Sequence, residues 1–422
     1  MRIAVDAMGG DNAPEAVVAG AVAAARDLGV SILLVGDRTR VEPELAKHKT
    51  HGLDIEARHA AEEVGMDEAP TAALRKSDSS LVVSLTALRD GDAGGLVFAG
   101  NTGAGMVLAA HVLGRVPGVE RPAIAVQVPH LQGHTILLDA GANVDSRGTH
   151  LVQFALMGDA YARAIRHVAA PRIGLVSNGT EDTKGGAAVR EAAPILDQLP
   201  INYVGRIEGA DILRGDVDVA VCDGFVGNVA LKSIEGFGSL IASRLREMLG
   251  QGVLRRLAGW ILRRHLQALG RDLDPGETGG ALLLGLNGTV VKAHGSSDAR
   301  AIRNAIGVAA ELSQARVSRE VGRSIATCLE LVAAGADIPA EDVVEPGRAR
   351  RLWNSIRKRF RRDHGPDEDD EPTAEDVELA SVAAPVDPEA VDEPSVEEGT
   401  MEPPAAEPEP PVEEETKAKV DS

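Results

Sequence analysis

Cysteines and long apolar runs are scarce in this sequence of 422 residues. Its two cysteines, Cys222 and Cys328, lie far apart and neither belongs to a Cys-x-x-Cys pair, so we expect reduced thiols in a cytoplasmic protein. The longest apolar runs, such as residues 281–286, are far shorter than the ~18 residues of a membrane-spanning helix. Met1 and Arg2 lead straight into a strand-like run, which is not the pattern of a signal peptide. The sequence therefore predicts a protein that lies at most on the surface of a membrane.

The motifs that mark several common enzyme classes are missing as well. No Gly-x-Gly-x-x-Gly lies between a strand and a helix, and no Gly-x-x-x-x-Gly-Lys-Ser/Thr occurs, so nicotinamide and nucleoside triphosphate sites lack their usual signature. There is no Gly-x-Ser-x-Gly elbow, no cysteine set for nucleophilic attack, and no His-Glu-x-x-His or Cys-x-x-Cys spacing for a metal. These absences favour a reaction in which a substrate supplies the nucleophile.

The formal net charge of −20 is concentrated in one segment. Residues 367–422 contain 21 acidic residues and two lysines, which leaves 42 basic and 43 acidic residues in the rest of the chain. This Pro/Glu/Ala/Asp-rich segment cannot bury enough apolar surface to offset the entropy cost of ordering, and we predict a disordered acidic tail. Because the remaining chain is nearly neutral and aromatic residues make up only 2% of the whole, nucleic acid is a poor candidate for a partner.

Short β-branched runs alternate with Ala/Leu-rich helical stretches from residue 1 to about 335. This alternation predicts an α/β fold, αβα layered, in which helices cover a largely parallel sheet. The expected strands span residues 3–5, 32–35, 96–98, 135–138, 173–176, 217–222 and 289–292, and the main expected helices span 16–28, 106–113, 150–166 and 229–249. We expect a catalytic domain over 1–335, a basic linker or amphipathic helix over 336–366, and the acidic tail over 367–422.

Six of these strands run into loops that are rich in Gly, Asn, Asp and Ser. The loops begin near Asp6, Gly100, Asp139, Ser177, Asp223 and His294. In an open α/β sheet such loops gather at the carboxyl ends of the strands, where ligands bind. Glycines let the backbone approach a ligand closely, and helix N-termini direct N–H groups at it. Each loop alone is also typical of ordinary caps and turns, but together they suit a small oxyanion such as phosphate. We expect bound phosphate itself to attack an activated carbonyl.

The same loops carry longer motifs, in a fixed order along about residues 1–325. They are VDAMGGD at 5–11, AGNTGA at 99–104, LDAGAN at 138–143, GTEDTKG at 179–185, DGFVGNVALK at 223–232 and GTVVKAHGSS at 288–297. In this combination they resemble the bacterial phosphate acyltransferases (PlsX type). The chain departs from that pattern at Ser177, where the family often has asparagine, and at Leu282, where proline is usual.

The resemblance implies a homodimer with a fold similar to the isocitrate and isopropylmalate dehydrogenases, without a metal or organic cofactor. It implies reversible transfer of a long-chain acyl group from acyl-[acyl carrier protein] to inorganic phosphate. The acyl phosphate would feed phosphatidic acid and phospholipid synthesis, with a glycerol-3-phosphate acyltransferase as the downstream partner.

Residue roles follow from loop placement as hypotheses. Positioning the phosphate beside the thioester carbonyl and stabilising the oxyanion are the main chemical demands. The candidate catalytic residues are Lys184, His294 and Asn228, of which the first two would counter developing charge or protonate the leaving thiolate. The candidate phosphate- or substrate-binding residues are Gly9, Gly10, Asp11, Asn101, Thr102, Gly103, Asp139, Asn143, Asp223, Gly227 and Ser296.

Other roles for the charged candidates stay open on the sequence alone. Lys184 is also compatible with a solvated helix start, and His294 with a cap of a helix that begins near Ser296. Asp139 and Asp223, like Asp6, lie at strand ends and are also compatible with holding loops together.

Two basic amphipathic stretches are candidate binding surfaces for partners. Residues 253–271 and 347–362 each interleave arginines with apolar side chains, which is typical of a helix on an anionic membrane or of a surface that docks an acidic carrier protein. The first stretch is also compatible with packing in a dimer. The resemblance implies peripheral membrane association for it, within a helical segment over about 236–272, at the inner face of the membrane.

Three rival functions remain. The nearest is a phosphotransacetylase-like enzyme that uses acyl-coenzyme A. A metal-dependent decarboxylating dehydrogenase would need a convergent set of aspartates, which the sequence does not offer. A non-catalytic membrane scaffold that recruits acyl carrier protein would not need the glycine-rich loops.

Overall fold

The computed structural model of the chain describes residues 1–250 and 279–334. These residues belong to a compact unit that spans Met1–Ala383, and a second unit, Ala384–Ser422, lies wholly outside them. The basic stretches at 253–271 and 347–362, the linker over 336–366 and the acidic tail over 367–422 also fall outside the described residues, so these expectations stay predictions.

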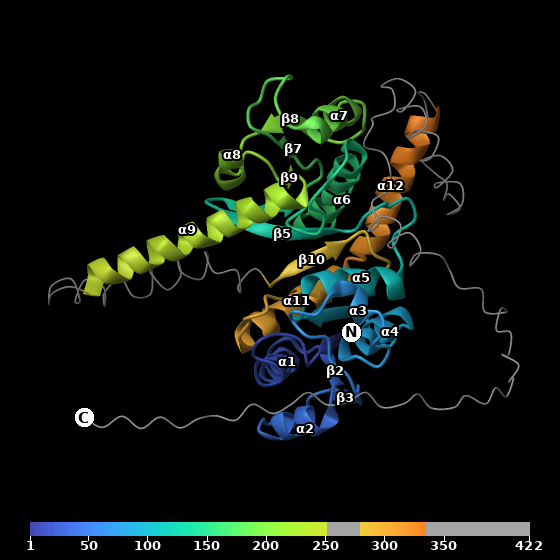
Figure 1. The fold of residues 1–422 in the computed structure, drawn as a ribbon, viewed down its shortest axis with the longest axis vertical. Coiled ribbons are helices and arrows are strands. Elements are labelled where there is room, and N and C mark those ends of the chain that lie inside the picture. The colour runs from blue at the N-terminus through green and yellow to red at the C-terminus, as the bar shows by residue number, and fades with distance from the viewer. Residues whose placement is uncertain (251–278, 335–422) are drawn as a thin grey trace, which may run out of the picture. The chain divides into compact units, whose positions relative to one another are not determined.

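Eleven strands form one sheet in the described part of the chain (Figure 1). In sheet order they are β3 (Ile55–His59), β2 (Ser31–Gly36), β1 (Arg2–Asp6), β4 (Gly95–Phe98), β11 (Val290–Lys292), β10 (Ala281–Leu284), β5 (Ala123–His130), β6 (Gly133–Leu138), β9 (Val219–Val221), β7 (Ile173–Val176) and β8 (Tyr203–Ile207). All seven strands expected from the sequence are present. β3, β5, β8 and β10 are additional to them.

The sheet consists of two parallel sets of strands that run in opposite directions. Strands β3, β2, β1, β4 and β11 form the first set, and β6, β9, β7 and β8 form the second. Between the sets, β10 is antiparallel to β11, β5 to β10, and β6 to β5, which makes three successive reversals. The expected, largely parallel sheet is confirmed. The expectation that all six loops end at one edge is wrong, because the carboxyl ends of the two sets point in opposite directions.

Separate groups of helices pack on the two faces of the sheet, as the αβα layering predicts. One face is covered by α1 (Glu15–Leu28), α2 (Arg38–Ala46), α6 (Gly148–Arg166), α7 (Ala187–Leu196), α11 (Ala299–Gln314) and α12 (Val317–Ala334). The other face carries α3 (Pro70–Ala73), α4 (Ser80–Arg89), α5 (Thr102–Leu113), α8 (Gly209–Arg214) and the start of α9 (Gly224–Gly250). The main expected helices correspond to α1, α5, α6 and α9.

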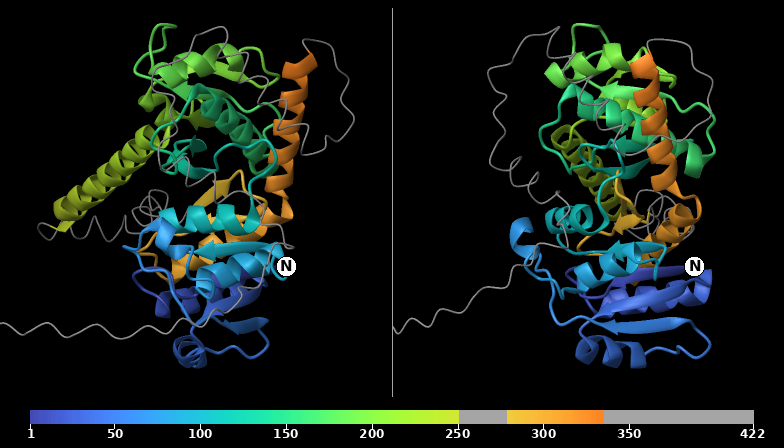
Figure 2. Two further views of the ribbon diagram at one scale, coloured as in Figure 1. Left: turned by 45° about the vertical axis from the view of Figure 1, so that its right-hand side comes forward. Right: turned by 90° about the vertical axis from the view of Figure 1, so that its right-hand side faces the viewer.

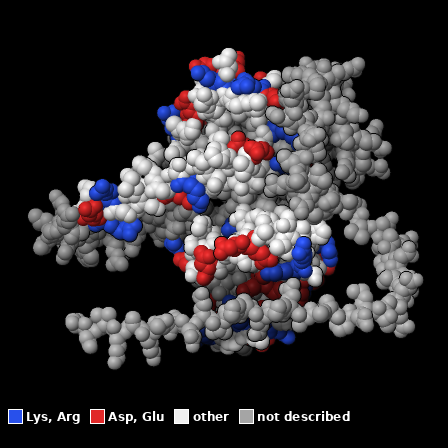
Figure 3. All heavy atoms as spheres, in the orientation of Figure 1, with Lys and Arg blue, Asp and Glu red and all other residues white. Residues whose placement is uncertain are grey.

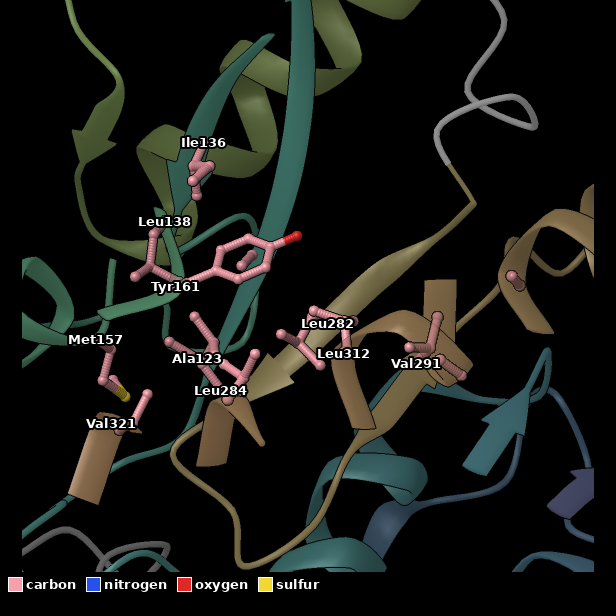
Figure 4. Close-up of a cluster of buried hydrophobic side chains, with 14 of the residues drawn as sticks. Ala123, Ile136, Leu138, Met157, Tyr161, Leu282, Leu284, Val291, Leu312 and Val321 are labelled. Carbon is pink, nitrogen blue, oxygen red and sulfur yellow. The ribbon is translucent and has the colours of Figure 1, made fainter. Parts of the chain in front are cut away.

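The antiparallel centre of the sheet is held by a continuous apolar core. Leu282 and Leu284 of β10 are 4% and 2% exposed and lie with Ala123 of β5, Met157 of α6 and Leu312 of α11 (Figure 4). Burial of apolar surface stabilises a fold by about 25 cal/mol per Å². Because this core contains side chains from both halves of the sheet, it fixes the two parallel sets to one another.

The surface of the described residues carries charges of both signs. Lys/Arg and Asp/Glu side chains both appear on the face seen in Figure 3. Within 1–250 and 279–334, none of the helices combines the length and the apolar character that crossing a membrane requires.

Candidate functional site

Three loops meet at the carboxyl ends of the first strand set. They follow β1, β4 and β11, and we call them the first loop group. The backbone N–H of Asp11 donates to the carbonyl oxygen of Gly295 at 2.8 Å. The side-chain Nδ2 of Asn12 donates to the carbonyl oxygens of Ser296 and Ser297 at 3.1 and 3.3 Å. The loop after β1 is thus tied to the loop after β11, although the two are almost 300 residues apart.

Gly9 lies where the loops after β1 and β4 touch. A Cβ atom at this position would lie 2.8 Å from both the backbone N of Gly100 and Oδ2 of Asp6, so only glycine fits. The next residue, Gly10, has a φ of 107°, in the region that favours glycine. Burial raises the pKa of Asp6, whose carboxylate accepts a hydrogen bond from the N–H of Met8 at 3.1 Å. Glycine is therefore required at Gly9 by the close packing of two loops and at Gly10 by its backbone conformation, whichever ligand the loop holds.

Asn101 caps the N-terminus of α5. Its Oδ1 accepts from the N–H of Ala104 at 3.0 Å, and its Nδ2 donates to the carbonyl oxygens of Met66 and Glu68 at 2.8 and 2.9 Å. The side chain thus fixes the helix start instead of facing an open site. Thr102 and Gly103 follow as the first two residues of α5, where a helix N-terminus favours an anion.

His294 and Ser296 lie in the loop after β11. Nδ1 of His294 lies 2.9 Å from Oγ of Ser296 and accepts from the N–H of Ser296 at 3.3 Å. The neutral imidazole therefore carries its proton on Nε2. Helix α11 begins at Ala299 and is capped by Asp298, so a capping role for His294 is wrong. Its ring is left with Nε2–H as a hydrogen-bond donor.

Loops after β6, β9 and β7 form a second group at the carboxyl ends of the second strand set. Asp139 is its buried centre: the carboxylate accepts from the N–H groups of Ile124, Gly141, Ala142 and Asn143 at 2.7–3.1 Å. The side-chain Nδ2 of Asn143 also donates to Asp139, at 2.8 Å, and to the carbonyl oxygen of Pro122 at 2.9 Å. Burial raises the pKa of Asp139, and these donors partly offset that effect. The contacts of Asp139 and Asn143 hold the loop in shape.

The loop after β9 packs directly on the loop after β6. The N–H of Gly224 donates to the carbonyl oxygen of Asn143 at 2.7 Å, and Asp223 accepts from the N–H of Val226 at 2.7 Å. At Gly227 a Cβ atom would overlap the carbonyl oxygen of Asp139. Asn228 follows on the surface of α9, beside Gly141, and its side chain is exposed.

Cys222 precedes this loop and is not suited to nucleophilic attack. The residue is buried, and its Sγ lies 3.6 Å from the carbonyl oxygen of Asp139. Burial, followed by the charges of Asp139 and Asp223, raises the pKa of the Cys222 thiol well above its ordinary value. A thiol in this state is not a thiolate at neutral pH, which agrees with the absence of a nucleophile motif.

Lys184 lies in the loop after β7, in the second group. It is half-buried, and its aliphatic chain covers Gly179. The Oδ1 of Asn178 accepts from the N–H of Gly185 at 2.9 Å, which holds the loop around the lysine. Among the described residues no hydrogen bond or ion pair occupies the Lys184 ammonium group, so it is free to meet a ligand.

Helix α9 connects the two loop groups. It begins in the loop after β9 and extends past the sheet (Figures 1 and 2). One turn after Asn228, Lys232 interacts electrostatically with both His294 and Lys292 of the first group, and Glu235 interacts with His294. Partial burial and the charges of Lys232 and Lys292 lower the pKa of His294. The candidates therefore occupy two groups of loops, with α9 between them.

Lys232 and Lys292 are the residues that the sequence reasoning did not select. Lys232 ends one motif of the resemblance and Lys292 lies within another, but neither lies in a glycine-rich loop. Two signals were available: Lys232 stands at i+4 from Asn228 on a helix, and Lys292 is a lysine in an otherwise apolar strand. The structure brings them together only because the reversed strands place α9 near the end of β11.

No group of three or more His, Cys, Asp or Glu side chains suited to a metal ion occurs within the described ranges. The expected lack of a metal or organic cofactor stays a prediction.

Comparisons with known proteins cover most of the chain. Residues 1–320 match the family model described as "Fatty acid synthesis protein". The chain is 48% identical over 328 residues to the phosphate acyltransferase of Geobacter sulfurreducens, which covers 78% of this chain and 95% of that protein. It is 46% identical over 335 residues to the phosphate acyltransferase of Nitratidesulfovibrio vulgaris, covering 79% and 97%.

Two solved structures align with the chain at low sequence identity. A phosphotransacetylase from Streptococcus pyogenes aligns with a TM-score of 0.49 at 17% identity, over 74% of this chain and 94% of that one. A branched-chain phosphotransacylase from Enterococcus faecalis aligns with a TM-score of 0.49 at 12% identity, over 74% and 99%.

Proposed function

The chain belongs to the phosphate acyltransferase family, an enzyme family that transfers acyl groups to phosphate, and from this premise we propose the full reaction. The donor is a long-chain acyl-[acyl carrier protein], the acceptor is inorganic phosphate, and the transfer is reversible. The acyl phosphate product serves phosphatidic acid and phospholipid synthesis and passes to a glycerol-3-phosphate acyltransferase.

The convergence of the first loop group carries this proposal. Gly9 and Gly10 contact the loops after β4 and β11, and the N-terminus of α5 begins at Thr102 in the same place. Backbone N–H groups and a helix N-terminus together favour a small anion. We assign the phosphate cradle to Gly9, Gly10, Asp11, Thr102, Gly103 and Ser296, with Asn101 holding the start of α5 in place beside them.

In the proposed step an oxygen of bound phosphate attacks the thioester carbonyl carbon. A C–O bond forms and the C–S bond breaks. Hydrogen phosphate releases its proton to solvent and the leaving thiolate takes up one proton, so the numbers of protons balance. We propose the ammonium of Lys184 as the donor of the proton to the thiolate and the Nε2–H of His294 as a hydrogen-bond donor to the tetrahedral oxyanion. Asn228 orients the carbonyl, and Asp139, Asn143, Asp223 and Gly227 keep its loop in place.

Substitution of these two donors tests this step. Lys184→Ala and His294→Ala should each lower kcat by roughly 10²-fold or more, the usual range for a lost acid–base group or a lost oxyanion donor. Lys47→Ala and His51→Ala change exposed residues of the same types and serve as matched controls. Wild-type turnover in both site variants would remove them from the mechanism.

A single assay distinguishes acyl carrier protein from coenzyme A as the carrier of the acyl group. The chain is incubated with phosphate and EDTA and with either acyl carrier protein thioester or coenzyme A thioester, and acyl phosphate is trapped with hydroxylamine. We expect product from the carrier thioester without metal. Product from coenzyme A alone would favour a phosphotransacetylase-like enzyme, and no product from either would favour a non-catalytic scaffold.

We also propose that the enzyme is a cytoplasmic homodimer at the inner face of an anionic membrane, with a fold related to the isocitrate and isopropylmalate dehydrogenases. The support for the dimer and for the membrane surface is α9, on which Phe237, Leu240 and Met248 are 64%, 53% and 61% exposed. Large apolar side chains in this number on one helix indicate a surface that is covered in the working assembly. Light scattering of the purified chain measures its oligomeric state.

A further inference from the structure

Lys292 has an environment that the roles above do not explain. It is the last residue of β11, is partly buried, and donates from Nζ to the carbonyl oxygen of Ala293 at 2.6 Å. No carboxylate within the described ranges forms an ion pair with it. An ammonium group has three donors, so a single carbonyl leaves a half-buried charge largely uncompensated.

The charged groups that face Lys292 come from three elements. Lys232 on α9 opposes its charge, and Asp11 in the loop after β1 favours it. His294 is two residues further along the same chain, and Lys232 is paired with Glu235 at 2.8 Å. Burial, then the charge of Lys232, lowers the pKa of Lys292 to about 8. The contacts with protein groups therefore do not stabilise the ammonium fully.

Lys292 also borders the first loop group. The N–H of Ala293 donates to the carbonyl oxygen of Phe98 at 2.8 Å, so the end of β11 lies against the end of β4, from which Asn101 and α5 follow. On the other side, a Cβ atom at Gly10 would lie 3.1 Å from the carbonyl oxygen of Gly295, so these two loops are also in close contact. A dianion seated among these loops would lie beside an ammonium group that forms no ion pair with a described carboxylate.

We propose that Lys292 is a phosphate-binding residue: together with Lys232 of α9, it holds the phosphate dianion between α9 and the loop after β11. This role deepens the proposed function and rests on it. The two lysines come from different halves of the sheet, so they would fix the attacking oxygen relative to the carbonyl held by the second loop group.

Phosphate binding should then be coupled to proton uptake. In the free enzyme the Lys292 ammonium loses its proton as the pH rises through about 8. A bound dianion favours the ammonium form and raises its pKa, so above pH 8 phosphate binding takes up a proton. Isothermal titration calorimetry at pH 8.5, in two buffers of different ionisation enthalpy, measures that proton directly without any acyl donor.

Four variants test the roles of the two lysines in phosphate affinity and in proton uptake. Lys292→Gln should weaken phosphate binding by roughly 10- to 100-fold, as for a lost charged hydrogen bond, and should raise KM for phosphate more than it lowers kcat. Lys292→Arg should retain much of the affinity but take up no proton, because arginine does not titrate at this pH. Lys232→Gln should reduce the uptake, because without that cation the pKa of free Lys292 rises and a larger fraction of it is already protonated. Lys47→Gln, at the exposed C-terminal cap of α2, should match the wild type.

Wild-type phosphate affinity in Lys292→Gln, or undiminished proton uptake in folded Lys292→Arg, would overturn the role of Lys292. Circular dichroism establishes that each variant is folded. Failure of the wild-type chain to form acyl phosphate from any thioester would instead overturn the proposed function. The two results are measured separately, one with phosphate alone and the other with the acyl donor.

Discussion

At the scale of single residues, two glycines of the site occupy positions where no side chain fits. A Cβ atom at Gly227 would overlap the carbonyl oxygen of Asp139, and a Cβ atom at Gly9 would lie 2.8 Å from the backbone N of Gly100. In both places two loops cross with no room for a Cβ atom. The signature glycines therefore have a structural task that is independent of any ligand.

Replacing Gly227 with alanine should destabilise the fold. The added methyl would force the loops after β6 and β9 apart, and overpacking of this kind costs about 1–3 kcal/mol. Urea denaturation measures the loss in the free energy of unfolding. Gly209→Ala is the matched control, because a Cβ atom there meets nothing within 4 Å. Equal stability of the two variants would contradict the packing argument.

The titration of His294 tests the approach of α9 to the first loop group. Its pKa is lowered by partial burial and by the charges of Lys232 and Lys292. Lys232→Gln removes one of these cations, so the pKa of His294 should rise toward its ordinary value and the imidazolium form should persist to higher pH. NMR titration of the histidine rings measures the shift. An unchanged His294 pKa would mean that Lys232 lies too far away to matter, and Arg244→Gln, further along α9, provides the comparison.

At the scale of elements, apolar alternation identified the strands of both parallel sets but not their directions. β10 was visible only as a short apolar run, and its antiparallel pairing with β11 and β5 is a tertiary property that no local pattern contains. The polar edge strands β3 and β8 also lack a strong signal, since their residues are largely exposed or half-buried. Loop composition located both loop groups. It could not locate Lys232, whose relevance depends on the direction of β9 and hence of α9.

The exposed face of α9 gives a prediction at this scale. A Phe237→Asp/Leu240→Asp double variant places charges on side chains that are already exposed, so folding of the chain should be unaffected. Association should weaken: pelleting with anionic liposomes, or the dimer fraction by light scattering, should fall by about tenfold or more, since burying an aspartate on an apolar surface costs several kcal/mol. Ser243→Asp, an exposed polar position of the same helix, is the control. No change in either measurement would show that this face stays in solvent.

At the scale of the whole molecule, charge separates the chain into three parts. A mildly acidic region over residues 1–346 is followed by a basic stretch at 347–362 and by the acidic tail over 367–422. Opposite charges so close along a chain attract each other at low ionic strength. The tail is therefore expected to compete with anionic membranes, or with the acidic carrier protein, for the basic stretch.

Removal of the tail tests this competition. A chain that ends at residue 366 should pellet more strongly than the full chain with anionic liposomes at low salt, and the difference should shrink as salt is raised. Equal pelleting of the two chains at low salt would contradict competition by the tail. Acyl transfer assayed with both chains in the absence of membranes shows whether the catalytic region is unaffected, as we expect.

The position of β11 also has a consequence for synthesis of the protein on the ribosome. β11 lies between β4 and β10, so a strand from near the end of the described chain completes a sheet begun by residues 2–6. The loop after it supplies the partners of Asp11 and Asn12. A nascent chain of 280 residues therefore holds most of the candidate residues but cannot close the phosphate cradle. Translation must therefore pass residue 297 before the enzyme can act, and products terminated before that point should be inactive.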